Sequence, residues 1–492
     1  VSFSIGLYLI IKNKKIIKLR YISFKKFFIL SCALPLLLIL ITHKLRNWDT
    51  FTHWMLLSDT IYFTNKLPIN VFHDYYVPSL YYFEFLVKRI TFNPGLENVY
   101  VILYFYLILC IVFTILNIFK NNFKFFPFVF LWVIISPIFI NFFTFSSYND
   151  FGLSCMLFAV YYFLYIKNLD IFDNKNNLII FILLNSLVIL TKTEGVIHSF
   201  LISLFILINE IYLNKFKNIK KIIVYFISIS LIFLLWRFHL YINSIDTKSL
   251  GGLEDYLVTA KYFSDFLVGL KNNIISKKEF YLASIIVLGY SLFSKKFIYN
   301  KIIKIYWFHL IFFSFFLIII MFGSFAPEHI KKASSFWRYS SQLNGPLLLL
   351  FSILIFKNIS VQKFIMKFSI IFFILACITP IILISKYRQD LFSYEFHIQK
   401  NIKLLRKHIK KGDQVTVISN KPHYHSMILY YYLPKKIKYN RGDYSDLEIV
   451  SNNIQIKNPK LKDNDYIIYL DKNYTSDENY LIIVKDKTLK KL

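Results

Sequence analysis

The sequence predicts an all-α polytopic membrane protein of about eleven transmembrane helices, followed by a small C-terminal extramembrane α/β domain. Of its 492 residues, 56% are hydrophobic and 17% are charged, whereas a soluble domain carries about 25% charged residues. Apolar runs recur between residues 27 and 386, and they approach the roughly 20 residues that a helix needs to cross a hydrocarbon core. The polar segment that follows has short strand-like runs instead.

The breaks between the apolar runs define the expected spans. The spans are residues 27–43, 99–118, 125–143, 150–166, 178–191, 196–213, 222–240, 280–294, 305–322, 343–356 and 368–386. With their connections they form a transmembrane domain over 1–386. The extramembrane domain, 387–492, is expected to combine the strand-like runs VTVIS, DYIIYL and YLIIV with a helical stretch near 423–433.

The distribution of charge predicts the orientation. Lysines gather in alternate short loops, such as Lys215, Lys217, Lys220 and Lys221, whereas nearly all carboxylates before the tail lie in the opposite loops. Because cytoplasmic loops carry the excess of Lys and Arg, the N-terminus is expected to be cytoplasmic, in a multi-pass protein of the cytoplasmic (inner) membrane. An odd number of spans then places the C-terminal domain on the extracytoplasmic side.

The net charge of +30 does not indicate a nucleic-acid partner. Nucleic-acid-binding proteins collect their basic residues on one face, often among exposed aromatic side chains. In this chain the basic residues stand in short clusters between apolar runs, as membrane topology requires. We therefore expect membrane lipids as partners and no nucleic acid.

The cysteines and the N-terminal segment suggest no further chemistry. Cys32, Cys110, Cys155 and Cys377 lie in apolar runs without CxxC or Cys/His spacing, so neither a disulfide framework nor a zinc site is expected. The basic segment 12–26 leads into a full-length apolar run with no small-residue cleavage site. No cleavable signal peptide is expected.

Two external segments are longer than a simple connection needs. Residues 44–98 form a first loop rich in His, Trp, Tyr and acidic residues. Within 241–279, apolar residues such as Phe263 recur at helical spacing across 252–271, and polar residues such as Asp265 occupy the other side. This pattern predicts an amphipathic helix that lies in the plane of the membrane.

The segment NWDTFTHWMLLSDT, residues 47–60, directly follows the first expected span. In a helix, Asp49 and His53 would share a face, and Asp59 lies further along the same segment. A carboxylate here can accept a proton from a sugar hydroxyl as a general base, while the two tryptophans supply a stacking wall. The alternative is an interfacial aromatic belt with solvated acids.

Further ionisable residues stand at the outer ends of expected spans. They are Asp150 in SSYND, Lys192 and Glu194 in TKTEG, Arg237 near the end of 222–240, and Arg338 with Tyr339 in FWRYSSQLNGP. Such groups are costly to desolvate and usually face a cavity or a partner. Alternatively, Lys192 and Glu194 form an ion pair at the surface. Arg338 and Arg237 either clamp a lipid phosphate or extend to the headgroups.

The order and placement of these motifs resemble the GT-C superfamily of membrane glycosyltransferases, which use polyprenyl-phosphate-linked sugars. The resemblance covers most of residues 27–386. It rests on NWDTFTHW, the Tyr/Pro segment YYVPSLYYF with Tyr76, SYNDFGL, KTEGV and WRYSSQLNGPLLLL. A polar tail after the last span also fits that superfamily.

The resemblance implies an inverting glycosyltransferase on the outer face of the cytoplasmic membrane. Asp49 would be the general base, with His53 and Asp59 as its catalytic neighbours. Substrate and lipid phosphate would contact Tyr76, Asp150, Lys192, Glu194, Arg237, Arg338 and Tyr339. Polyprenyl phosphate is the leaving group, so no organic cofactor is expected, whereas first-loop carboxylates could hold a divalent metal ion. The acceptor is a lipid, a glycan or a protein.

Two other classes of protein share several of these features. An envelope-polysaccharide polymerase or ligase also combines many spans, large external loops and lipid-linked substrates. A transporter or flippase would place charged or Gly/Pro-broken helices near mid-membrane and would show paired halves. Here the acidic residues stand at the external ends of the spans and no halves match, so the sequence favours the transferase.

Overall fold

The computed structural model describes residues 24–41, 55–65, 67, 79–92, 99–118, 122–137, 139, 149–172, 174–214, 218–245, 253–293, 297–333 and 336–384, and in the tail 414–419, 438–442, 447–450, 453–456, 466–470, 480–485 and 488–491. The chain forms two compact units. The first consists of residues 1–39, 75–80 and 101–383, and the second of residues 40–74, 81–100 and 384–492.

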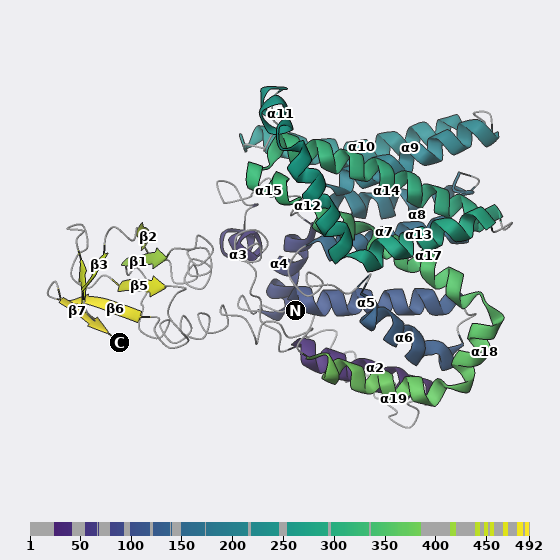
Figure 1. The fold of residues 1–492 in the computed structure, drawn as a ribbon, viewed down its shortest axis with the longest axis horizontal. Coiled ribbons are helices and arrows are strands. Elements are labelled where there is room, and N and C mark those ends of the chain that lie inside the picture. Colours follow the sequence, from purple (N-terminus) through teal and green to yellow (C-terminus); the bar gives the residue numbers. More distant parts are fainter. Residues whose placement is uncertain are drawn as a thin grey trace. The chain divides into compact units, whose positions relative to one another are not determined.

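The described part of the first unit is helical (Figure 1). Its helices are α2 (Phe24–Ile41), α5 (Val99–Ile118), α6 (Phe126–Ile135), α7 (Asn149–Ile166), α8 (Lys175–Thr191), α9 (Gly195–Asn214), α10 (Ile219–Ile242), α11 (Leu253–Ala260), α12 (Phe263–Ser276), α13 (Lys278–Phe293), α14 (Phe297–Ser324), α15 (Pro327–Lys332), α16 (Phe336–Ser340), α17 (Asn344–Phe356), α18 (Ile359–Lys367) and α19 (Ser369–Ile382). Two short 3-10 helices, η3 (Phe123–Phe125) and η4 (Ser341–Leu343), precede α6 and α17.

Six helical segments of the described residues are long and apolar enough to cross a membrane, or up to seven if α18 and α19, which meet at 74°, form one bent span. The six are Val101–Ile118, Asn149–Ile166, Gly195–Tyr212, Ile219–Ile242, Lys301–Ser324 and Phe336–Phe356. The chain is therefore a multi-pass helical membrane protein, as the composition predicts.

The expected count of eleven spans is not supported by the described helices. Four of the expected spans fall on shorter helices: α6, α8 and α13 are 10, 17 and 16 residues long, and the apolar part of α2 is Ile29–Ile41. A perpendicular crossing needs about 20 residues. Apolar composition alone does not separate a short buried helix from a span, and that ambiguity explains the difference.

Helices α7 and α17 form the core of the bundle. The window Asn149–Ile166 is 72% buried and Phe336–Phe356 is 78% buried, against 17% for Ile219–Ile242 on α10. Helix α7 contacts α8, α14 and α17, and α8 also contacts α9 and α10. The backbone N–H of Gly345 donates to Ser154 Oγ at 2.7 Å, and a Cβ at Gly345 would lie 2.0 Å from the Ser154 carbonyl oxygen. Only glycine permits this approach.

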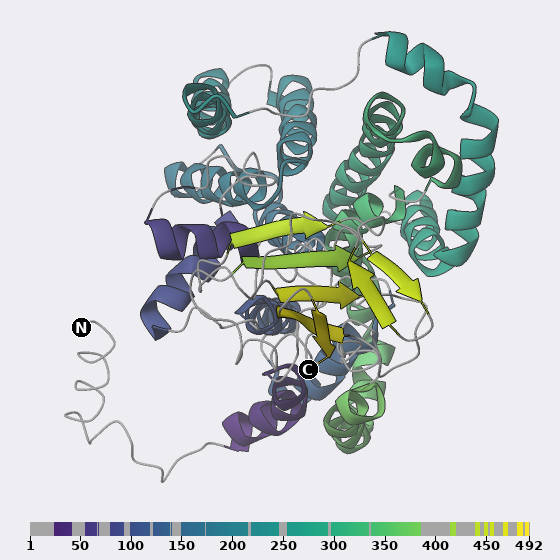
Figure 2. The same cartoon turned by 90° about the vertical axis from the view of Figure 1, so that its left-hand side faces the viewer.

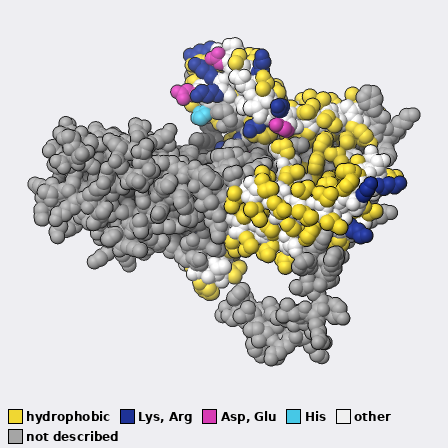
Figure 3. All heavy atoms as spheres, turned by 60° about the horizontal axis from the view of Figure 1, so that its bottom comes forward, with side chains coloured by type: hydrophobic (Ala, Val, Ile, Leu, Met, Phe, Trp, Pro, Cys, Tyr) yellow, Lys and Arg dark blue, Asp and Glu magenta, His cyan; other side chains and the backbone are white. Residues whose placement is uncertain are grey.

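The outer surface of the helical unit is largely apolar. Figure 3 shows hydrophobic side chains over most of the described face turned toward the viewer, with Lys and Arg at its margin. On α10 the exposed side chains include Leu231, Leu234, Leu235 and Phe238. A soluble protein rarely exposes such a continuous apolar surface, whereas a lipid bilayer solvates it.

The expected amphipathic helix over 252–271 is two helices, α11 and α12, separated by a turn at residues 261–262. Helix α12 packs on α15 at Gly269, whose Cβ position lies 2.5 Å from the Lys331 carbonyl oxygen, and the buried Phe266 contacts Phe322 of α14 and Phe336 of α16. Phe263, Leu267 and Val268 remain exposed. The apolar residues thus divide between a protein contact and the surface, and the position of these helices in the membrane plane stays a prediction.

The second unit contains two helices before the tail, α3 (Met55–Thr64) and α4 (Ser79–Thr91). The guanidinium of Arg89 on α4 lies 5.7 Å from the ring centroid of Tyr62 on α3. Within α4, Lys88 and Glu84 form a buried ion pair of 2.6 Å. The Arg89–Tyr62 contact links the two described helices of residues 44–98.

The described tail residues form seven strands, β1 (Gln414–Ser419), β2 (Lys438–Gly442), β3 (Leu447–Val450), β4 (Asn453–Ile456), β5 (Tyr466–Leu470), β6 (Tyr480–Lys485) and β7 (Thr488–Lys491). Figure 2 looks onto these strands. The order in the larger sheet is β2-β1-β5-β6-β7, in which β1 pairs in parallel with β2 and β5 and the remaining pairs are antiparallel. The helical stretch expected near 423–433 lies outside the described residues, so an α/β domain stays a prediction.

Candidate functional site

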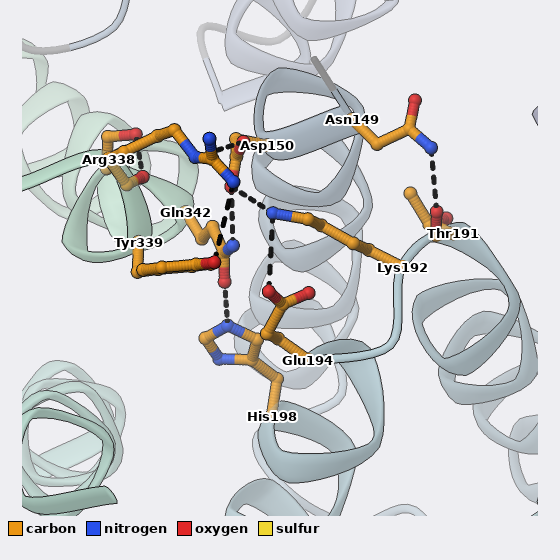
Figure 4. Close-up of polar contacts among 10 residues, drawn as sticks. Asn149, Asp150, Thr191, Lys192, Glu194, His198, Arg338, Tyr339 and Gln342 are labelled. Atoms are coloured by element: carbon orange, nitrogen blue, oxygen red, sulfur yellow. Dashed lines mark hydrogen bonds and ion pairs between the residues drawn. The ribbon is translucent and has the colours of Figure 1, made fainter. Parts of the chain in front are cut away.

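Three separate stretches of the first unit bring a cluster of charged side chains together: the start of α7, the connection from α8 to α9, and the α16–η4 segment (Figure 4). Lys192 Nζ lies 2.7 Å from Asp150 Oδ1 and 3.4 Å from Glu194 Oε1. Arg338 Nε lies 3.5 Å from Asp150 Oδ2. Asp150 is therefore the carboxylate that both cations share, and we name these four residues the charged cluster.

The connection between α8 and α9 presents Lys192 to Asp150. Lys192 is extended, with φ −157° and ψ 155°, and so ends α8. A Cβ at Gly195, the first residue of α9, would lie 1.9 Å from the Val188 carbonyl oxygen, so only glycine lets α9 start this close to α8. Asn149 Nδ2 donates to the Thr191 carbonyl oxygen at 3.2 Å and ties the start of α7 to this turn.

The charged cluster balances two cations against two carboxylates in a buried place. Asp150 and Lys192 are 2% and 4% exposed, respectively. Burial disfavours the charged form of Lys192, but the carboxylates of Asp150 and Glu194 outweigh it and raise the pKa of the ammonium group above its ordinary value. Removing one partner of such a pair leaves an uncompensated buried charge.

Tyr339 packs against both cations of the cluster. Its ring centroid lies 4.8 Å from Lys192 Nζ and 5.0 Å from Arg338 Cζ. The electron-rich face of an aromatic ring attracts cations at this range. The ring therefore helps to keep the two positive groups on the same side of Asp150.

A second group of polar side chains continues from the cluster into the bundle. Gln342 Nε2 donates to Asp150 Oδ1 at 2.6 Å, and Gln342 Oε1 lies 2.7 Å from His198 Nε2. His198 Nδ1 lies 2.7 Å from His309 Nε2, and His309 Nδ1 lies 3.0 Å from the Tyr161 hydroxyl. The side chains with 0% exposure are those of Gln342, His198, His309 and Tyr161.

The structure brings together five of the predicted site residues: Asp150, Lys192, Glu194, Arg338 and Tyr339. Lys192 and Glu194 form the ion pair of the alternative interpretation, at 3.4 Å, but the pair is not at the surface, because Lys192 is buried and lies closer to Asp150. Likewise, Arg338 contacts Asp150 and Tyr339 within the bundle.

The remaining predicted site residues do not join the cluster. Arg237 is exposed on α10 and takes part in none of the cluster's contacts. Asp49, His53 and Tyr76 lie outside the described residues. Asp59 lies on α3, but its side chain is outside the described part of the structure.

The sequence reasoning missed Gln342, His198, His309 and Tyr161. One signal was present: His198 follows Glu194 by four residues and Gln342 follows Arg338 by four, a spacing that places side chains on one helical face. His309 stands within an apolar span, where an ionisable residue indicates a buried polar site. The partners of these residues could not be assigned, because they are far apart in the chain.

Among the described residues, no group of three or more His, Cys, Asp or Glu side chains is placed to hold a metal ion. The metal expectation rests on first-loop carboxylates, and of these Asp49 and the side chain of Asp59 are outside that part of the chain. The chain matches no protein-family model, no curated protein and no solved structure. Its function must therefore be argued from the site itself.

Proposed function

We propose that the protein is a membrane glycosyltransferase that moves a sugar from a polyprenyl-phosphate donor to an acceptor on the outer face of the cytoplasmic membrane. The observation that supports this proposal is the charged cluster. Three of the motifs that resemble the GT-C superfamily, SYND, KTEG and WRYSS, are distant in the sequence, yet their charged residues meet at the ends of buried helices.

The cations of the cluster suit a departing phosphate. Guanidinium and ammonium groups bind phosphate oxygens strongly, and preorganised charges stabilise a transition state without reorganising. Lys192 and Arg338 would offset the charge that grows on polyprenyl phosphate as the glycosidic bond breaks. Asp150 would hold both cations in place before the lipid binds.

The carboxylates of the cluster suit the sugar. Within the described residues, Glu194 Oε2 and Asp150 Oδ2 are buried and accept no hydrogen bond, although Asp150 Oδ2 faces Arg338 Nε at 3.5 Å. Buried acceptors are normally satisfied by a donor. Sugar hydroxyl groups are such donors, so Glu194 and Asp150 would orient the donor sugar beside the two cations.

Asp49 would act as the general base in an inverting displacement. Its carboxylate takes the proton of an acceptor hydroxyl, the hydroxyl oxygen bonds to the anomeric carbon, and the bond from that carbon to the phosphate oxygen breaks. His53 and Asp59 would assist, and Tyr76 and Tyr339 would contact the substrate. A divalent ion on first-loop carboxylates remains part of this proposal.

Asp49→Asn tests the general base. We expect sugar transfer to be abolished while membrane insertion and abundance stay normal, because the amide keeps the shape of the carboxylate but cannot take the proton. The measurement is analysis of lipid-linked intermediates and surface glycans in a deletion strain that carries the variant. Near-normal transfer would reject Asp49 as the base.

The same strain separates the transferase from an envelope-polysaccharide polymerase or ligase. Loss of a single sugar residue supports a transferase, whereas loss of chain length supports a polymerase. The position of Arg338 in the charged cluster favours this second candidate, since such enzymes depend on external arginines. A polymerase would lose activity in Arg338→Ala and keep it in Asp49→Asn.

A further inference from the structure

The hydrogen-bonded chain from Asp150 to Tyr161 crosses four elements, and the proposed chemistry does not use it. It runs from α7 through Gln342 on η4, His198 on α9 and His309 on α14, and returns to Tyr161 on α7. Helix α7 carries both ends, eleven positions apart. The chain therefore links the charged cluster to the interior of the bundle.

With both imidazoles neutral, the ionised carboxylate at one end fixes the direction of every hydrogen bond in the chain. An ionised carboxylate only accepts, so the amide nitrogen of Gln342 must face Asp150 and its oxygen must face His198. His198 Nε2 then carries the hydrogen, and His198 Nδ1 is an acceptor. It follows that His309 Nε2 donates to His198, and that the Tyr161 hydroxyl donates to His309 Nδ1.

The surroundings of the two imidazoles favour neutral rings. Both histidines are fully buried, and the ring of Phe313 lies 4.0 Å from the ring of His198, centroid to centroid. Each ring nitrogen has one partner in the chain. A doubly protonated His198 would place a positive charge in this buried setting, with neutral groups, Gln342 Oε1 and His309 Nε2, as the partners of its two ring nitrogens, and burying such a charge without a carboxylate beside it is costly.

We propose that Gln342, His198 and His309 are positioning residues for Asp150. The two imidazoles are both neutral Nε2–H tautomers, and every hydrogen bond of the chain donates toward the Asp150 carboxylate. Oriented bonds of this kind polarise one another and strengthen the last of them. The chain thereby holds the Asp150 carboxylate, and through it Lys192 and Arg338, in one geometry. The effect of this hydrogen-bonded chain on catalysis rests on the proposed function, whereas the assignment of the histidine tautomers does not.

The same geometry argues against a proton-conducting pathway. Proton transfer along the chain would have to pass through Gln342, whose amide lacks a basic nitrogen and does not titrate in the ordinary pH range. The two histidines are thus separated from Asp150 by a group that transmits orientation but not protons. This observation weighs against a transporter coupled to protons through these residues.

The tautomers are measured by ¹⁵N NMR of the imidazole nitrogens in the full chain, labelled with ¹⁵N-histidine and purified in detergent near neutral pH. The protein has 11 histidines, so the signals that disappear in His198→Gln and in His309→Gln assign the two rings. His239→Gln on α10 is the control for a histidine outside the hydrogen-bonded chain. We expect both rings to be neutral, with Nε2 protonated and Nδ1 bare. A protonated Nδ1 on either ring, or a cationic ring, would overturn the proposal.

A matched pair of variants tests the positioning role. His198→Gln places an amide nitrogen near the former Nε2 and keeps the donor to Gln342, whereas His198→Asn places its amide near the former Nδ1 and loses that donor. We expect turnover to fall about tenfold or more in His198→Asn, with the KM for the lipid-linked sugar little changed, and to be largely retained in His198→Gln.

Equal turnover in the two His198 variants would reject the positioning role, because a side chain that only fills space has no reason to distinguish them. If the protein transfers no sugar at all, the proposed function fails while the NMR result still decides the tautomers. The two failures are therefore distinguishable.

Discussion

At the scale of single residues, Asp150 organises the site. Its Oδ1 atom receives the Lys192 ammonium and the Gln342 amide, and its Oδ2 atom faces the Arg338 guanidinium. A buried carboxylate is tolerated only when such partners replace water. The stability of the buried Asp150 carboxylate therefore depends on Lys192, Gln342 and Arg338 together.

Lys192→Met tests this dependence. The substitution leaves Asp150 and Glu194 with one cation fewer in a buried place, and breaking a buried pair from one side costs about 3 kcal/mol or more. We expect a clearly lower thermal midpoint in detergent. Arg237→Met, which removes an exposed cation from α10, is the matched control and should change the midpoint little.

The double variant Lys192→Met with Asp150→Asn should recover part of that loss, because it removes both charges together. The coupling energy is the change in unfolding free energy of the double variant minus the sum of the changes in the single variants Lys192→Met and Asp150→Asn. Additive losses would show that Lys192 and Asp150 do not act as a pair.

The raised pKa of Lys192 sets the pH range of the pair. A pKa raised by folding contributes stability that is fully present below the unfolded value, about 10.4, and is lost as the pH rises through the folded value. The stability difference between the native chain and Lys192→Met should therefore be constant from about pH 6 to about pH 9. A difference that already declines near pH 8, measured by thermal unfolding, would contradict the ion pair.

At the scale of elements, the contact between α7 and α17 positions the cluster. Asp150 lies in the first turn of α7, and Gln342 lies on η4, two positions before α17 begins at Asn344. Ser154 and Gly345 hold the two helices close by the hydrogen bond described above. Separation of these helices would move Gln342 away from Asp150.

Gly345→Ala should separate the helices and destabilise the protein strongly, because its Cβ would overlap the Ser154 carbonyl oxygen, a backbone atom that cannot simply turn aside. Gly289→Ala on α13 is the matched control. No atom lies within 4 Å of the Cβ position at Gly289, and alanine favours a helix by roughly 0.5–1 kcal/mol over glycine. We expect a lower thermal midpoint for the first variant and an unchanged or higher midpoint for the second. Equal midpoints would contradict the close contact.

The sequence predicted the elements of the site better than their partners. Asp150, Lys192, Glu194 and Arg338 stand at breaks between apolar runs, where a charge is conspicuous, and were predicted as site residues on that ground. His309 lies inside an apolar run of α14 and contacts residues on α7 and α9, a pairing that no local pattern encodes. The described helices do not support eleven spans, because α6, α8 and α13 are apolar but shorter than a span.

At the scale of the whole molecule, the alternation of lysine-rich and acidic connections predicts one orientation in the membrane. Lys363 on α18 belongs to the expected cytoplasmic connections, and Lys271 on α12 to the expected external ones. Both side chains are exposed. The proposed chemistry requires this orientation, since a polyprenyl-phosphate donor on the outer face needs no nucleotide.

Single cysteines at positions 271 and 363, introduced after replacement of the four native cysteines, test the orientation. A membrane-impermeant maleimide should label Lys271→Cys in intact cells and label Lys363→Cys only after permeabilisation. The reverse pattern would place the charged cluster on the cytosolic side and would contradict transfer on the outer face.

The distribution of the cluster along the chain has a consequence for biosynthesis. Asp150 and Lys192 are 42 positions apart, whereas Gln342 follows Asp150 by 192. During translation, α7 and α8 emerge long before η4, so Asp150, Lys192 and Glu194 would enter the translocon before Arg338 and Gln342 are made. The Lys192 ammonium then offsets part of the carboxylate charge in the nascent hairpin, and the later arrival of Arg338 and Gln342 completes a site whose first half is already inserted.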